Sequence, residues 1–240
     1  MLFGVNQNHY PEMAAKVDGI TVQRSYKAMH LGWPVMPDGQ VAHWSIRPDH
    51  DQLLAGQLDA GLISLLEEAP PGSLLTGWHE AEHAKLPGTV AQQQAHIHQV
   101  HTHLHALVQQ VRPGEVLYGP VTLQGSRRGW VIPGMDFYGV DVYDLHGNTH
   151  PKAALDAWSA SMPDGPRVVA ETNSQVPPNR PQWFKAVYEW LAANHGIALE
   201  TFWNPTGPLS GAWVDSDTVT ISALQRVAES AGTPALALPG

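Results

Sequence analysis

The chain has 240 residues, a formal net charge of -9 and no cysteine. An acidic chain is poorly suited to bind nucleic acid or an anionic membrane, and the absence of cysteine excludes disulfides and thiol chemistry. Apolar residues make up 43% of the sequence, but no apolar run reaches the length of a membrane span, so we expect one soluble domain over residues 1–240 without membrane insertion.

Short apolar segments alternate with helical patterns along the whole chain. Strands are predicted at residues 2–6, 20–24, 41–46, 73–76, 116–122, 136–143, 167–171 and 197–203. Helical spacing occurs at residues 11–17, 49–68, 89–111, 151–162, 181–194 and 218–230, whereas the connection at 126–132 is too short for a full helix. This alternation predicts an α/β fold, a compact single-domain (β/α)₈ TIM barrel with trimmed loops. An open doubly wound sheet is the alternative, but no glycine-rich dinucleotide or phosphate motif supports it.

The richest stretch follows the fourth predicted strand, where residues 77–83 read Gly-Trp-His-Glu-Ala-Glu-His. In a barrel, the carboxyl ends of the strands carry the catalytic groups. Trp78, His79 and Glu80 therefore lie at the barrel mouth in this prediction. Glu82 has the same strand parity as Glu80 and is the alternative acid.

The same residues also fit the H-E-x-x-H pattern of zinc peptidases, with His79 and His83 as metal ligands. That pattern requires a helix, which places both imidazoles on one face. Gly77 on one side and Pro87 on the other leave room for only about two helical turns. Because there is so little room for a helix, we keep a zinc metallopeptidase only as an alternative interpretation.

A second carboxylate, Glu171, ends the seventh predicted strand and lies across the barrel mouth from Glu80. Two facing carboxyl groups are what glycoside hydrolysis requires, one as the acid and one as the nucleophile or base. Other polar or aromatic residues that end predicted strands are Arg24, Tyr143 and Trp203, and Asp141 alternates with Tyr143.

This layout resembles the clan A retaining glycoside hydrolases, which use carboxylates at the ends of strands four and seven. Trp78-His79-Glu80 is most similar to family 26, in which a histidine precedes the acid/base. The resemblance implies that Glu80 is the acid/base and Glu171 the nucleophile, held ionised by a hydrogen bond from Tyr143 and by the nearby charge of Arg24. It also implies that His79 binds substrate or orients Glu80, and that Trp203 lies under the reacting sugar.

Five histidines fall within residues 96–105, and His98, His101 and His105 share one face of the predicted helix. Such spacing suits metal ligands, but no carboxylate or cysteine completes the set, so we interpret this face as solvated.

The sequence therefore predicts a retaining glycoside hydrolase that acts on a polysaccharide or oligosaccharide without a cofactor or metal. A barrel that binds glycan without cleaving it is a further alternative. The chain begins directly on a predicted strand, so we expect it to carry no export signal.

Overall fold

The computed structural model describes residues 2–6, 22–26, 41–83, 86–126, 128–144, 150–174, 177–194, 196–201 and 225. Its strands pair in parallel in one sheet, in the order β5-β4-β3-β2-β1-β9-β8-β7-β6. The strands are β1 (Leu2–Asn6), β2 (Val22–Ser25), β3 (Val41–Ile46), β4 (Leu74–Gly77), β5 (Leu117–Tyr118), β6 (Val121–Leu123), β7 (Tyr138–Asp144), β8 (Arg167–Ser174) and β9 (Gly196–Thr201).

The sheet closes into a barrel because β5 and β6 are two halves of one strand. β5 pairs with β4 and β6 pairs with β7, and the chain between them continues both ladders. The amide of Gly119 donates to Leu75 (3.1 Å), and the Pro120 carbonyl accepts from Gly139 (2.8 Å). A Cβ on Gly119 would lie 2.3 Å from the Phe137 carbonyl oxygen, so only glycine fits at this break. The predicted eight-stranded barrel is confirmed, although the strand expected at 116–122 is interrupted.

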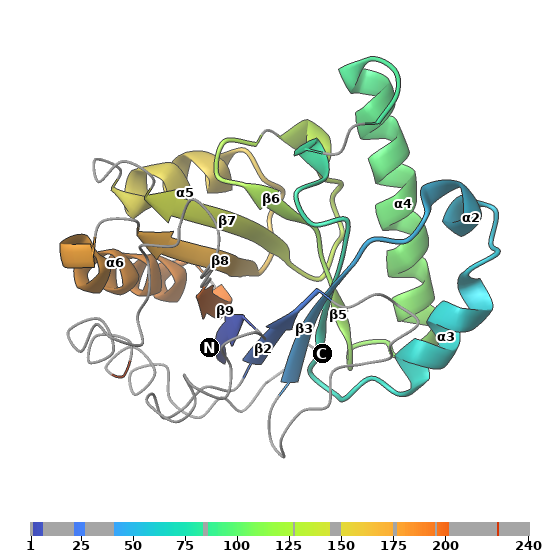
Figure 1. Cartoon of the computed structure of the whole chain (residues 1–240), viewed down its shortest axis with the longest axis horizontal. Coiled ribbons are helices and arrows are strands. Elements are labelled where there is room, and N and C mark those ends of the chain that lie inside the picture. The colour runs from blue at the N-terminus through green and yellow to red at the C-terminus, as the bar shows by residue number, and fades with distance from the viewer. Residues whose placement is uncertain are drawn as a thin grey trace.

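Helices flank the barrel on two sides (Figure 1). They are α2 (His50–Leu54), α3 (Asp59–Glu67) and α4 (Val90–Val111) on one side, and α5 (Pro151–Ala160) and α6 (Arg180–Ala193) on the other. The single helix predicted at 49–68 is wrong, because the chain turns between α2 and α3 at Gly56, which has φ 72°. Between β6 and β7, the described residues form only the short 3₁₀ helix η4 (Arg128–Trp130), in agreement with the trimmed connection that the sequence predicts.

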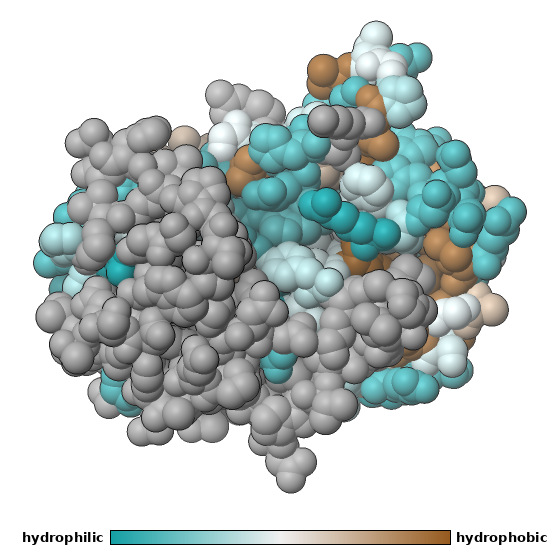
Figure 2. Space-filling model, in the orientation of Figure 1, coloured by the Kyte–Doolittle hydropathy of each residue, from teal (hydrophilic) through white to brown (hydrophobic). Residues whose placement is uncertain are grey.

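Two of the predicted helices fall largely outside the described part of the chain. Residues 11–17 lie outside it entirely, and of residues 218–230 only Gln225 is described. Among the described residues, no helix combines the length and the apolar character needed to cross a bilayer. Figure 2 shows a largely hydrophilic face over α2 and α4, with separate hydrophobic spots.

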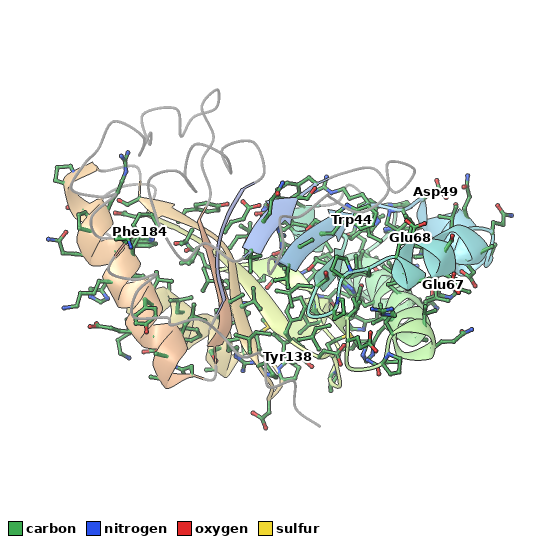
Figure 3. All side chains as sticks on the ribbon, turned by 90° about the horizontal axis from the view of Figure 1, so that it is seen from below. Trp44, Asp49, Glu67, Glu68, Tyr138 and Phe184 are labelled. Carbon is green, nitrogen blue, oxygen red and sulfur yellow. The ribbon has the colours of Figure 1, made fainter. Side chains whose placement is uncertain are left out.

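The core has an inner and an outer part, as the two faces of a closed sheet require. The outer part packs the strands against the helices and includes Trp44 of β3 and Phe184 of α6 (Figure 3). The inner part fills the barrel with Val22, Leu74, Leu117, Val121, Phe137, Val168, Ala170 and Ala198.

One irregularity in β8 determines which residues of this strand face the interior. Val168 and Ala170 lie in the inner core and Val169 in the outer one, so strict alternation would turn the next residue, Glu171, outward. The register instead shifts by one residue, since Val140 of β7 pairs with Val169 but Asp141 pairs with Glu171. Thr172 then faces outward and accepts a hydrogen bond from Trp183 of α6 (2.8 Å). This bulge turns Glu171 toward the barrel interior.

Candidate active site

The turn after β4 has a strained backbone. Trp78 (φ 50°) and Glu80 (φ 52°) both occupy the left-handed region, which residues other than glycine rarely adopt and which costs about 1–3 kcal/mol for each such residue. The Trp78 amide donates to Ile46 (2.9 Å), and its indole donates to the Pro48 carbonyl (3.0 Å). These hydrogen bonds hold the turn so that His79 and Glu80 follow the strand directly.

The carboxylate of Glu82 joins this turn to the fifth barrel strand. Its Oε1 accepts from the Leu123 amide (2.5 Å) and from the Ser126 hydroxyl. The Glu80 amide donates to Val121 (2.9 Å), so the turn is attached to β6 at two points. Because its Oε1 accepts from these two donors, Glu82 holds the turn against β6.

His79 is buried and contacts two carboxylates. Its Nε2 is hydrogen-bonded to Oδ2 of Asp141 and lies 3.8 Å from Oε1 of Glu171. Tyr26 stacks on the imidazole ring, with centroids 5.5 Å apart. Burial, and then the charge of Arg24, lowers the pKa of His79 to about 3, so the ring is neutral at physiological pH.

Glu171 and Tyr143 interact directly, as the resemblance to clan A implies. The Tyr143 hydroxyl donates to Oε2 of Glu171. Burial raises the pKa of Glu171 to about 7, while the charge of Arg24 opposes this rise. Arg24 therefore lowers the pKa of Glu171, as expected, but burial raises this pKa by more.

Asp141 lies between the two predicted catalytic residues. Burial raises its pKa to about 8, with Arg24 again opposing the shift. Side-chain ligand atoms of Asp141, His79 and Glu171 lie within 4.8 Å of one another. The pKa of Glu80 is also raised, first by burial and then by the negative charge of Asp141. Glu80 and Glu171 thus approach the same buried aspartate from β4 and β8.

Arg24 lies fully buried beneath these carboxyl groups. Its guanidinium contacts the His43 ring, and His43 Nε2 lies 2.9 Å from the Thr76 hydroxyl, which donates to the Gly119 carbonyl (2.9 Å). The pKa of His43 is lowered well below its usual value by burial and by Arg24, so this histidine is uncharged. The positive charge of Arg24 is therefore available to the acidic cluster above it.

Two pockets adjoin this cluster. One of about 530 Å³ is lined by Trp78 together with Asp49, His50, Asp51, Leu86, Pro87, Gly88, Gln92 and His96. The other, of about 480 Å³, is lined by Tyr143 together with Glu82, His83, Leu123, Gln124, Gly125, Ser126 and Trp130. Each pocket contains a tryptophan and at least one carboxylate, and no lysine or arginine is among these described lining residues.

The zinc-peptidase geometry is not found. His79 precedes the 3₁₀ helix η3 (Ala81–His83), so His79 and His83 do not share a helical face. In the described part of the chain, only His79, Asp141 and Glu171 place three potential ligand atoms within 4.8 Å of one another. Those atoms already interact with each other and with Tyr143, so we assign no metal to them.

The prediction that the histidine-rich face of α4 is solvated is wrong. His101 is fully buried and its Nδ1 lies 2.7 Å from the Tyr118 hydroxyl, while burial lowers its pKa to about 3. The other histidines bind separate partners: His96 with His50, His98 with Gly129, His103 with Asp59 and His105 with Asp136. These side chains connect α4 to its neighbours and do not converge on one point.

Of the predicted site residues, the structure brings together Arg24, His79, Glu80, Tyr143 and Glu171, whereas Trp203 lies outside the described residues. The period-two spacing from Tyr143 predicts that Asp141 is a polar group of the barrel mouth, but the sequence assigns it no role in the site.

The fold is similar to that of glycoside hydrolase barrels, each 12% identical to this chain. A β-mannanase from a symbiotic protist of the termite Reticulitermes speratus has a TM-score of 0.59, covering 95% of this chain and 86% of that one. A GH26 β-mannanase from Bacteroides ovatus has a TM-score of 0.56, with coverage of 96% and 88%. A GH128 endo-β-1,3-glucanase from Amycolatopsis mediterranei has a TM-score of 0.58, with coverage of 94% and 99%. No protein-family model and no curated protein matches the sequence.

Proposed function

We propose that this barrel is a retaining glycoside hydrolase, with Glu171 as the nucleophile and Glu80 as the acid/base. The observation that carries this proposal is the convergence of the two carboxyl groups on Asp141 at the barrel mouth, in a fold that known glycoside hydrolases share. The chemistry is argued from the side chains, because at 12% identity the similarity establishes the fold alone.

In the first step, Glu171 attacks the anomeric carbon of the sugar. Its Oε2 is held by the Tyr143 hydroxyl, which leaves Oε1 for the attack. Arg24 favours the ionised form of Glu171, which the attack requires. A bulge that turns Glu171 inward and a tyrosine that orients it are what a nucleophile at this position needs.

Glu80 donates its proton to the leaving oxygen and later removes a proton from water. A general acid must hold its proton near neutral pH, and both burial and Asp141 raise the pKa of Glu80. The strained turn fixes Glu80 beside the cluster instead of letting it point into solvent.

The flanking pockets favour a substrate that extends to both sides of the cleaved bond. Trp78 and Trp130 supply apolar rings against which sugar rings can pack. The substrate class is therefore a polysaccharide or oligosaccharide.

The test is turnover on a panel of neutral, amino-sugar and uronate polysaccharides, followed by trapping with a 2-fluoro glycoside of the active sugar. We expect a covalent adduct on Glu171 in the wild type and none in Glu171→Gln. Glu80→Gln should retain activity on aryl glycosides with good leaving groups and should be partly rescued by azide, which needs no base. Glycan binding without any turnover would instead favour a non-catalytic glycan-binding barrel.

A further inference from the structure

Tyr26, the residue that follows β2, has an aromatic side chain that is exposed and yet contacts the buried cluster. Its exposed fraction is 43%, and among the described residues only Val90 of α4 is another large hydrophobic side chain with such exposure. A tyrosine combines a large apolar face with a polar end, which suits a ligand that has both kinds of surface. The mechanism above gives this side chain no role.

Two contacts hold the ring of Tyr26 in place. The imidazole of His79 stacks against one face, with centroids 5.5 Å apart and the two planes inclined by 26°. At the polar end, Nε of the buried Arg24 donates to the Tyr26 hydroxyl (3.2 Å). The surface of the ring that remains exposed therefore faces away from His79. Because the ring is already fixed, a ligand that packs on it loses little affinity to ordering of the side chain.

The ring lies one layer away from the proposed nucleophile. His79, which it covers, has its Nε2 3.8 Å from Oε1 of Glu171. A sugar packed on the exposed face of Tyr26 is separated from His79 by the thickness of the tyrosine ring. Such a sugar therefore occupies a position next to the attacked unit and not the attacked position itself.

The hydroxyl group of Tyr26 adds a directional contact at the edge of this face. A phenolic group has one O–H donor in addition to its acceptor lone pairs. Arg24 uses the acceptor side, and the described part of the chain supplies no acceptor for the Tyr26 O–H. Because the group that donates to the phenolic oxygen is a charged guanidinium, the Tyr26 O–H is polarised and is a stronger donor. It is therefore available to donate to an oxygen of a sugar.

We propose that Tyr26 forms a subsite for a pyranose ring, adjacent to the sugar that Glu171 attacks. The C–H bonds on one face of the sugar pack against the exposed face of Tyr26, and the Tyr26 hydroxyl donates to a sugar oxygen. The proposal rests on the proposed function of the site. It narrows the ligand to an oligosaccharide of at least two pyranose units, in which the unit at Tyr26 has one face of axial C–H bonds.

The test is oligosaccharide binding by Glu171→Gln, which removes turnover and leaves Tyr26 in place. Isothermal titration calorimetry with mannohexaose, cellohexaose and laminarihexaose gives the affinities. In this background, Tyr26→Ala should weaken the binding of at least one hexaose about tenfold, because the stacked face is lost. Tyr26→Phe keeps the ring and loses only the hydroxyl, so it should weaken binding about threefold. Val90→Ala removes exposed apolar surface from α4 and is the matched control, which should leave every affinity unchanged.

A nuclear Overhauser measurement separates stacking from an indirect effect through His79 or Arg24. With ring-labelled tyrosine in Glu171→Gln, and with the Tyr26 resonances assigned through Tyr26→Phe, the ring protons of Tyr26 should show Overhauser effects to C–H protons of the bound hexaose. Unchanged affinity in Tyr26→Ala, absence of these Overhauser effects, or no binding of any of the three hexaoses would overturn the subsite. Binding through Tyr26 together with no cleavage of any glycan by the wild type would count only against the proposed function.

Discussion

Replacing Glu171 by Gln should make the protein more stable at alkaline pH. Burial raises the pKa of Glu171 to about 7 from an ordinary value of 4.5. Each pKa unit corresponds to about 1.4 kcal/mol, so ionising this side chain in the folded protein costs about 3 kcal/mol. Glutamine has nearly the same shape, accepts the same hydrogen bond from Tyr143 and does not ionise.

The sign of the effect follows from the raised pKa. The protonated carboxyl group favours the folded state, so its contribution to stability is complete below about pH 4.5 and is lost as the pH rises through about 7. The stability difference between Glu171→Gln and wild type should therefore increase by about 3 kcal/mol between pH 5 and pH 9. For a chain of this size, each kcal/mol shifts the melting temperature by about 2–4 °C.

Urea unfolding at both pH values measures this difference directly. Glu67→Gln, on the exposed surface of α3 (Figure 3), is the matched control and should show no such increase. If the difference between Glu171→Gln and wild type does not change with pH, the carboxyl group of Glu171 is not buried in the way that the bulge implies.

Three other outcomes are expected. Turnover should rise with pH through about 7, as Glu171 ionises, and should fall at higher pH as Glu80, whose pKa is also raised, loses its proton; a pH-rate profile measures both limbs. Gly119→Ala should cost about 1–3 kcal/mol by urea unfolding because its Cβ meets the Phe137 carbonyl at 2.3 Å, whereas Gly125→Ala, with nothing within 4 Å, should cost much less. The purified protein should be free of zinc by elemental analysis and insensitive to chelators, and stoichiometric zinc would contradict the assignment of the site.

Apolar periodicity was sufficient to predict the strands and the helices α4, α5 and α6. Each barrel strand needs a short buried run with a polar tip, and the sequence around Glu80 and around Tyr143 shows this plainly. Helix boundaries depended on single residues: Gly56 adopts a left-handed conformation and divides α2 from α3, although apolar spacing continues across it.

Features that depend on contacts between distant elements were harder to predict from the sequence. The histidines of α4 have a polar pattern typical of a solvated face, but their partners come from other elements, including Asp59 of α3 and Tyr118 of β5. The hydrogen bond between His79 and Asp141 joins residues that are 62 positions apart in the chain. A single sequence carries no signal for such a pairing until the barrel brings β4 and β7 together.

The bulge in β8 means that this strand carries one residue more than a regular ladder needs. Val140 and Asp141 are consecutive in β7, but their partners Val169 and Glu171 are separated by Ala170. Deleting Ala170 would therefore restore strict alternation and still leave Glu171 opposite Asp141 and facing the interior, with Thr172 toward α6. Straightening the strand with Ala170 kept would instead turn Glu171 toward α6 and Thr172 toward the barrel mouth.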